Sequence, residues 1–216
     1  MKSDMQLRDE VQAELAWEPS IDASQVGVIA KSGIVTLTGR LNSYAQKAII
    51  EDVVWRVGGV KAIALELDVA LPPDQARNDG DIALAIENAM QWHVSVPERN
   101  IRVKVEKGWV TLSGEVDWDF QRQAAADAVR PLSGVRGLSN QLTLKPRATP
   151  SDIGERVTAA LQRHAQREAR QIWASVSGST VTLHGHVDAW SDRVEAQAAA
   201  WAAPGVTRVI NEITIK

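Results

Sequence analysis

Cysteine is absent from this chain of 216 residues, and phenylalanine and tyrosine occur once each. Without cysteine the protein can form no disulfide, no thiolate nucleophile and no cysteine–metal site. No apolar run approaches the roughly 20 residues that a membrane-spanning helix needs. The first ten residues are polar and acidic and lack the apolar segment of a secretory signal. These absences favour a cytoplasmic protein without a transmembrane segment.

The chain also has little net charge, because acidic and basic residues are nearly balanced. The net charge is −3, which argues against nucleic acid as a partner because binding to phosphate backbones needs clustered basic residues. The charge is nevertheless distributed unevenly along the chain. It is −3 in residues 1–71, −1 in residues 72–146 and +1 in residues 147–216, where eight basic residues face seven acidic ones.

One motif occurs three times, Thr-Leu-x-Gly, with its threonine at positions 36, 111 and 182. The period is therefore 75 and then 71 residues, and a Gly-Val pair follows each motif glycine at an offset of 20 residues. Such a period indicates three copies of one small domain, which we place at residues 1–71, 77–146 and 150–216. The glycines with an expected structural role are Gly39, Gly59, Gly114, Gly134, Gly185 and Gly205.

Each copy has the same periodicity. Apolar residues at i, i+4 and i+8, such as Leu7, Val11 and Leu15, predict an amphipathic helix. An alternating stretch, a glycine turn and the motif strand predict a hairpin, whose turn has one extra residue in the third copy, where Gly178 precedes Gly185 by seven positions. A second helix, capped by Asn42 in the first copy and ended by the glycine of the Gly-Val pair, leads to a last strand.

The predicted fold class is α+β, with three tandem αββαβ units. The strand–helix–strand part of each unit is a crossover, so its two strands should run parallel with a right-handed connection. Each unit should then be a three-stranded mixed sheet with both helices on one face.

The units resemble BON domains, the family named for bacterial osmotically inducible and nodulation proteins. The resemblance rests on the G-W-V-T-L-S-G segment at 108–114 and on the G-V-x-x-V-x-N-x-[LI] endings at 134–142 and 205–213. The first copy departs from this pattern at Leu65, where the others have Asn140 and Asn211. The resemblance implies non-enzymatic roles: association with anionic phospholipid membranes, envelope maintenance, protection in osmotic stress and, in some members, chaperone-like binding. Since members are commonly exported, it also implies a periplasmic alternative to the cytoplasm.

We therefore expect a non-enzymatic binding module for anionic phospholipid or envelope components in an osmotic or stress response. The alternative is a chaperone-like or scaffolding protein that binds other polypeptides through open sheet faces and grooves. No G-x-S-x-G, phosphate-binding glycine loop or H-E-x-x-H occurs in the sequence, so we expect neither catalysis nor a cofactor.

A basic stripe is the main candidate for lipid contact. Arg163, Arg167 and Arg170 lie at i, i+4 and i+7 and share one face if the first helix of the third unit extends that far. Arginine side chains suit lipid phosphates, and Trp190 would assist if exposed. The alternative interpretation is an ordinary solvated helix face.

Two other groups have a conceivable chemical role. His184 and His186 would lie on one face of a strand and could ligate a metal together with Asp188. Zinc, however, usually has three or four protein ligands. An exposed strand edge is therefore the favoured interpretation. Asp117 and Asp119 form an acidic pair, for which helix capping is favoured over acid–base chemistry.

Eight tryptophans stand out beside a single phenylalanine. Trp17 matches Trp92, and Trp55 matches Trp201, when the repeats are superimposed in sequence. Recurrence at matched positions predicts packing within or between units. Trp118 and Trp190 match only loosely and are the predicted exposed or interfacial aromatics.

Overall fold

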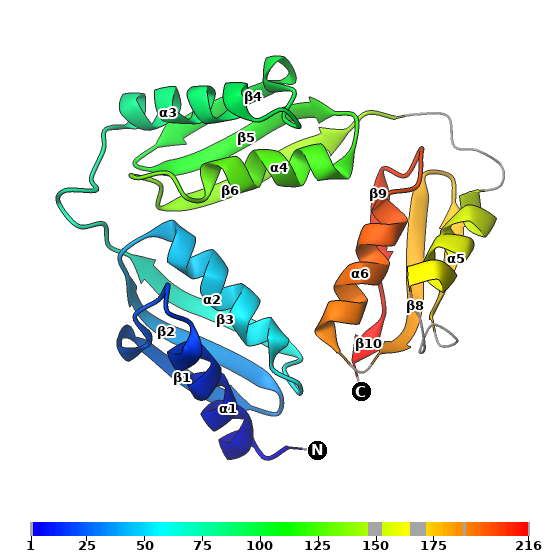
Figure 1. Ribbon diagram of the computed structural model, residues 1–216, viewed down its shortest axis with the longest axis horizontal. Helices are drawn as coiled ribbons and strands as arrows, with labels where there is room; N and C mark the ends of the chain where they lie inside the picture. Colours follow the sequence, from blue (N-terminus) through cyan, green and yellow to red (C-terminus); the bar gives the residue numbers. More distant parts are fainter. Residues whose placement is uncertain (1, 147–152, 165–171, 188, 216) are drawn as a thin grey trace. The chain divides into compact units, whose positions relative to one another are not determined.

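The computed structural model describes residues 2–146, 153–164, 172–187 and 189–215 (Figure 1). Three successive αββαβ repeats make up the described chain, which confirms the predicted α+β class. By internal contacts the chain forms two compact units, Met1–Val116 with Phe120–Thr143, and Asp117–Asp119 with Leu144–Lys216. The proposed boundaries at 1–71, 77–146 and 150–216 stay a prediction; those segments are called repeats 1, 2 and 3 below.

Repeat 1 shows the predicted order of elements, and its hairpin and crossover have the predicted directions. Strand β1 pairs antiparallel with β2, and β2 pairs parallel with β3 in an unbroken register from Ile34–Ala62 to Leu41–Val69. The elements are α1 (Asp4–Trp17), β1 (Val26–Lys31), β2 (Ile34–Leu41), α2 (Tyr44–Arg56) and β3 (Ala62–Val69).

Repeats 2 and 3 have the same strand order, with the motif strand in the centre of each sheet. In repeat 3 the last strand is split into two short pieces that both pair parallel with β8. Repeat 2 contains α3 (Asp79–Trp92), β4 (Ile101–Glu106), β5 (Trp109–Val116), α4 (Asp119–Val129) and β6 (Gly137–Leu144). Repeat 3 contains α5 (Ile153–His164), β7 (Ile172–Ser177), β8 (Thr180–Val187), α6 (Trp190–Trp201), β9 (Arg208–Asn211) and β10 (Thr214–Ile215).

Each core lies between two helices and one face of the sheet. In repeat 1, Val11 of α1, Leu37 of β2 and Val54 of α2 are completely buried in one cluster. In repeat 2, Val129 is likewise completely buried, as its position on the helix predicts. Because strand side chains alternate between faces, the other half of each strand forms an open face without a helix.

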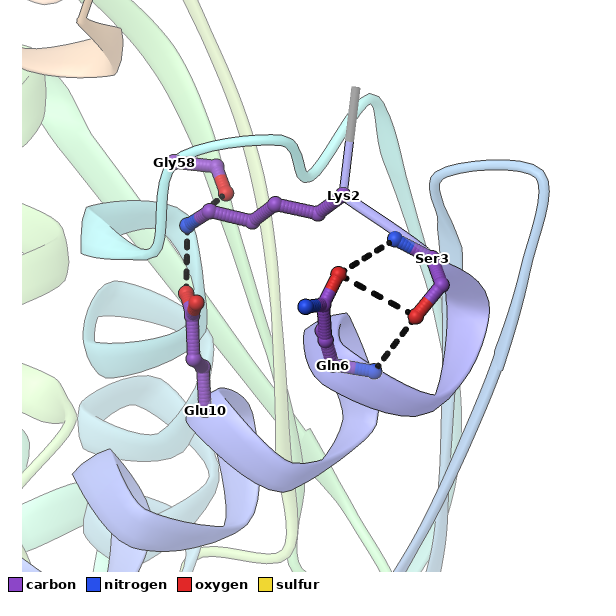
Figure 2. Close-up of polar contacts among 5 residues, drawn as sticks. All are labelled: Lys2, Ser3, Gln6, Glu10 and Gly58. Atoms are coloured by element: carbon purple, nitrogen blue, oxygen red, sulfur yellow. Dashed lines mark hydrogen bonds and ion pairs between the residues drawn. The ribbon is translucent and has the colours of Figure 1, made fainter.

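The first helix begins with a capping box (Figure 2). The Ser3 hydroxyl accepts the Gln6 backbone N–H at 3.2 Å, and the Gln6 side-chain oxygen accepts the Ser3 N–H at 2.9 Å. This exchange satisfies two helix N–H groups that have no intrahelical partner. Lys2 pairs with Glu10 and donates to the Gly58 carbonyl at 2.9 Å, which links the start of α1 to the turn after α2.

The motif glycines are required by a close backbone approach. Gly39 and Gly114 have φ angles of 144° and 131°, a region that disfavours residues with a side chain. A Cβ on Gly39 would lie 2.0 Å from the Gln25 carbonyl oxygen, and one on Gly114 would lie 2.1 Å from that of Asn100. The glycine therefore lets the backbone just before the first strand lie close against the motif strand.

Two local predictions are wrong. Helix α2 is capped by Ser43, not Asn42, because the Ser43 hydroxyl accepts the Gln46 N–H. Its C-cap is the extended Val57, so Gly59 (φ 102°) forms the turn into β3 and is not the residue that ends the helix.

The third hairpin turn has no extra residue. Ser177 pairs with Thr180, so the loop is the two residues Gly178 and Ser179, as short as the Ser32–Gly33 turn of repeat 1. The glycine occupies the first turn position instead of the second, which explains the altered spacing in the sequence.

The asparagine of the repeat ending ties the last strand to the second helix. The side chain of Asn211 donates to the Arg193 carbonyl at 3.3 Å and accepts the Ile213 N–H at 3.1 Å. Asn140 makes the same pair of bonds in repeat 2, with Arg122 and Leu142. Repeat 1 has Leu65 at this position, and its last strand pairs without interruption.

Candidate functional site

The first helices of repeats 1 and 2 both end in an exposed tryptophan. The side chains of Trp17 and Trp92 are 86% and 88% exposed, and each is the last residue of its helix. The prediction that this pair packs within its own repeats is therefore wrong. The matched positions instead present the same large apolar side chain to solvent twice, which is unusual because exposed tryptophan leaves much apolar surface in water.

The segment Trp92–Ser95, called the repeat 2 tip here, adds a second apolar side chain. Val94 is fully exposed, while Val96 just beyond the tip is buried and anchors the segment to the core. The tip contains no acidic residue. It is therefore an apolar projection without negative charge.

The corresponding end of repeat 1 has a different charge. Glu18 follows Trp17 directly, and its carboxylate accepts the hydroxyl of Ser20 at 2.6 Å and the Ser20 N–H at 3.2 Å. These two hydrogen bonds lower the pKa of Glu18, so the carboxylate is ionised at neutral pH. Trp17 is thus accompanied by a fixed negative charge that Trp92 lacks.

Arg163 occupies the same place in repeat 3 that Trp17 and Trp92 occupy in the other two. Each lies two residues after the last apolar residue of the i, i+4, i+8 pattern. Arg163 belongs to α5, which ends at His164. Arg167 and Arg170 lie outside the described residues, so the basic stripe stays a prediction.

Trp190 begins α6 and is partly buried, and the guanidinium of Arg193 lies 4.7 Å from its ring centroid. Arg193 also donates to the carbonyls of Ile213 and Asn211 at 3.0 and 3.1 Å. Partial burial lowers the pKa of Arg193, which remains charged. Trp190 is therefore one layer of an arginine–aromatic stack, and its proposed contact with lipid stays a prediction.

For two of the other tryptophans the predicted packing is confirmed. Trp55 and Trp201 are partly buried and pack against the cores of repeats 1 and 3. Trp118, expected to be exposed, is partly buried. Two further tryptophans, Trp109 and Trp173, lie on open sheet faces and are 54% and 57% exposed. Their place was not predicted, although strand alternation alone would have assigned it.

The open face of repeat 3 contains an ordered polar group. Its centre is His184 on β8, whose Nδ1 lies 3.1 Å from the Glu212 carboxylate and whose Nε2 lies 3.0 Å from the Ser175 hydroxyl. The ring stacks on Trp173 at a centroid distance of 5.7 Å. Neither Ser175 nor Glu212 was a predicted site residue.

The predicted histidine pair does not converge on one ligand. His184 faces Glu212 and Ser175, whereas the Nε2 of His186 is buried with no hydrogen-bond partner in the described part of the chain. Asp188 lies outside that part. Across the described ranges, no three His, Asp or Glu side chains come together as a metal site.

The two acidic residues at the start of α4 also lie in different environments. Asp117 forms an ion pair with Lys145 at 3.7 Å, while Asp119 is in the first turn of α4 and only 8% exposed. A carboxylate at this end of a helix is stabilised by the helix dipole. The position of Asp119 thus agrees with the capping interpretation.

The comparisons with known proteins identify the family. The family model described as the BON domain matches residues 3–70, 78–146 and 150–216, so the chain belongs to the BON domain family. The chain is also 28% identical over 146 residues to the osmotically-inducible protein Y of Escherichia coli (strain K12). That match covers 66% of this chain and 73% of the relative.

Two solved structures of CdsD, described as a structural protein of the Type III secretion system of Chlamydia trachomatis, are similar at 16% identity. One covers 96% of this chain and 91% of its own; the other, of the C-terminal domain, covers 100% of both. The TM-score is 0.26 in each case, which is too low to support an argument. Among the described residues, no helix has the length and apolar character to cross a membrane.

Proposed function

We propose that this protein is a binding module for anionic phospholipid surfaces, with a role in the response to osmotic stress. The observation that carries the proposal is the exposed tryptophan at the end of α3, together with Val94 on the same tip. Family membership and the similarity to an osmotically inducible protein support the stress role. This role requires a membrane surface, which both the cytoplasm and the periplasm provide.

The tip has the chemistry of an interfacial anchor. Indole rings favour the boundary between headgroups and acyl chains because they are apolar and also carry an N–H donor. Removing apolar surface from water contributes about 25 cal/mol per Å², so Trp92 and Val94 together supply an appreciable apolar term. The absence of an acidic residue from Trp92–Ser95 leaves the tip free to approach an anionic surface.

Basic residues would supply the electrostatic part. A basic residue close to an anionic bilayer contributes about 1 kcal/mol, and Arg163 takes the position of the exposed tryptophans in repeat 3. We propose that it acts with Arg167 and Arg170, and that Trp190 contributes at the same surface. Three arginines alone bind weakly, so the apolar tip and the linkage of several contacts in one chain are both needed.

The experiment is co-sedimentation with vesicles of phosphatidylglycerol and phosphatidylcholine, compared with phosphatidylcholine alone. Trp92→Ala should lower the bound fraction on anionic vesicles severalfold. Trp109→Ala is the matched control, because Trp109 is an exposed tryptophan of the same repeat that lies on the sheet and not at a helix end. Equal losses in the two variants, or equal binding to both vesicle types, would contradict the proposal.

Polypeptide binding is the second candidate. The observation that favours it is the apolar part of the open face in repeat 1, where Ile29 and Ile34 are 60% and 48% exposed on neighbouring strands. Suppression of the aggregation of an unfolded test protein, abolished by Ile29→Ser with Ile34→Ser but not by Trp92→Ala, would support this candidate in place of lipid binding.

A further inference from the structure

We propose that Ser175 is an activated nucleophile that accepts acyl groups from activated esters, with His184 as its base and Glu212 as the group that orients the base. The activity would be additional to the binding role. The expectation of no catalysis rested on linear motifs, but an acid–imidazole–hydroxyl arrangement is defined by geometry and can be assembled from separate strands.

The three side chains reach one face because of strand alternation. Of their immediate neighbours, Leu183 and Ile213 belong to the core cluster of repeat 3 and Ala174 packs against it, so Ser175, His184 and Glu212 point to the opposite, open face. Ser175 comes from β7, His184 from β8, and Glu212 from the junction of β9 and β10.

The register of the last strand places the acid, because Leu183 pairs with Asn211 and His186 pairs with Thr214, so that Glu212 lies opposite His184. The Asn211 side-chain oxygen accepts the Ile213 N–H, while the Glu212 N–H donates to the Leu183 carbonyl at 2.9 Å. These bonds attach Glu212 to the strand that carries His184. The backbone of Glu212 is thereby held beside His184, and its exposed side chain reaches Nδ1 from there.

The contacts also determine the direction of the hydrogen bonds. An ionised carboxylate only accepts, so Nδ1 of His184 must carry the proton that it shares with Glu212 over 3.1 Å. In the neutral ring Nε2 is then an acceptor, and the Ser175 hydroxyl, 3.0 Å away, donates to it. This is the arrangement in which an imidazole can take a proton from a hydroxyl nucleophile.

The surroundings indicate the kind of substrate. Trp173 stacks on His184 and is still 57% exposed, so its indole offers an apolar surface next to Ser175. Ser175 and Trp173 are both exposed on the open face, so small esters can reach the hydroxyl. We therefore assign small activated esters with an aryl or short acyl group as the substrate class.

The reaction needs no reactant other than the ester and water. The Ser175 oxygen bonds to the ester carbonyl carbon as its proton passes to Nε2 of His184, and collapse of the adduct breaks the bond to the leaving group. With p-nitrophenyl acetate the products are acetyl-Ser175 and p-nitrophenolate, and the imidazole releases its proton to solvent. Water then attacks the acyl carbon through the same base, which frees acetate and restores the hydroxyl.

The matched control is Ser177. It lies two residues further along β7 on the same open face, pairs with Thr180 and is exposed, as Ser175 is. The contact with Nε2 of His184 is made by Ser175 and not, among the described residues, by Ser177. Both serines are thus exposed hydroxyls on one strand face, whereas assistance by a base is available to Ser175 alone.

The test is incubation of the full chain with p-nitrophenyl acetate, with release of p-nitrophenolate followed by absorbance and the acetylated residue located by peptide mass spectrometry. General-base assistance contributes about 100-fold or more, so Ser175→Ala and His184→Gln should remove at least nine-tenths of the fast acylation, and Glu212→Gln should slow it severalfold. Ser177→Ala should leave it unchanged. Acetylation confined to lysines or to the N-terminus, or equal rates for Ser175→Ala and Ser177→Ala, would overturn the proposal.

Discussion

The indole of Trp109 lies over the backbone of Gly137, so closely that a Cβ at position 137 would come within 2.3 Å of the ring atom Cε3. The contact is specific to repeat 2, since the corresponding residue of β2 is Ile34 and its partner on β3 is Ala62. A glycine in a strand often marks such a close approach.

Gly137→Ala should therefore displace the indole. Because the ring is on the exposed face, it can swing outward, so the cost should be modest, about 1 kcal/mol of unfolding free energy, with a shift in tryptophan fluorescence. Gly58→Ala is the control, since the nearest atom to a Cβ there is the flexible Lys2 ammonium at 3.7 Å. An unchanged fluorescence spectrum in Gly137→Ala would show that the ring does not lie where the structure places it.

A larger effect is expected at the glycine of the repeated motif. In Gly114→Ala the new Cβ would meet the Asn100 carbonyl, a backbone atom that cannot move aside, and φ is 131°. Both penalties act together, so we expect a loss of about 3 kcal/mol or more, measured as the change in urea unfolding midpoint. A loss no greater than that of Gly137→Ala would refute the close approach of the Asn100 carbonyl to Gly114.

Core packing gives a third prediction. Val129 is completely buried in α4, so Val129→Ala removes two methyl groups from a filled site and should cost about 1–3 kcal/mol. Val94→Ala makes the same chemical change at a fully exposed position and should alter the unfolding free energy by less than about 0.5 kcal/mol. Similar midpoints for the two variants would mean that the helix face is assigned wrongly.

Most of the fold was accessible from the sequence because its signals are local and occur three times. Gly39 and Gly114 mark the repeated motif strand, and the apolar spacing of each helix identifies the buried face. Predictions of smaller features were wrong where one sequence pattern is compatible with two different structures. Trp17 and Trp92 recur at matched positions, and recurrence fits a shared exposed surface as well as a shared core.

The polar group on repeat 3 could not be predicted for a different reason. Ser175 and Glu212 are 37 positions apart, and their contact with His184 follows only when the registers of the hairpin and of the last strand are both known. A shift of one residue in either strand would move a side chain to the opposite face. His184 was singled out from the sequence together with His186, but an exposed strand edge was the favoured interpretation and metal ligation the alternative.

The charge beside Trp17 gives a fourth prediction. The Ser20 hydrogen bonds lower the pKa of Glu18, so its negative charge opposes an anionic surface at neutral pH. Glu18→Gln should increase the fraction bound to phosphatidylglycerol vesicles at low salt, with no change on phosphatidylcholine. Protonation of Glu18 itself has the same direction of effect, and the lowered pKa moves that protonation to a pH below the usual value for a glutamate. Unchanged binding in Glu18→Gln would exclude contact of this helix end with the membrane.

The last prediction separates the apolar and electrostatic parts of binding. Replacing Arg163, Arg167 and Arg170 with Gln should lower binding to anionic vesicles most strongly at low ionic strength, because charge interactions are screened over about 10 Å at 0.1 M salt. The binding that remains should be nearly independent of salt and should disappear when Trp92→Ala is added. Circular dichroism and the unfolding midpoint show whether the fold is intact.

The control removes an equal charge from repeat 1 by changing Arg8, Arg40 and Arg56 to Gln. If lipid is bound through the basic stripe, this second triple variant retains most of the wild-type binding and its dependence on salt. If both triple variants lose binding equally, the protein responds to its net charge and the stripe has no special role. Unchanged binding in the first variant excludes this surface as the lipid contact, and loss of residual binding on adding Trp92→Ala would then assign the contact to the repeat 2 tip alone.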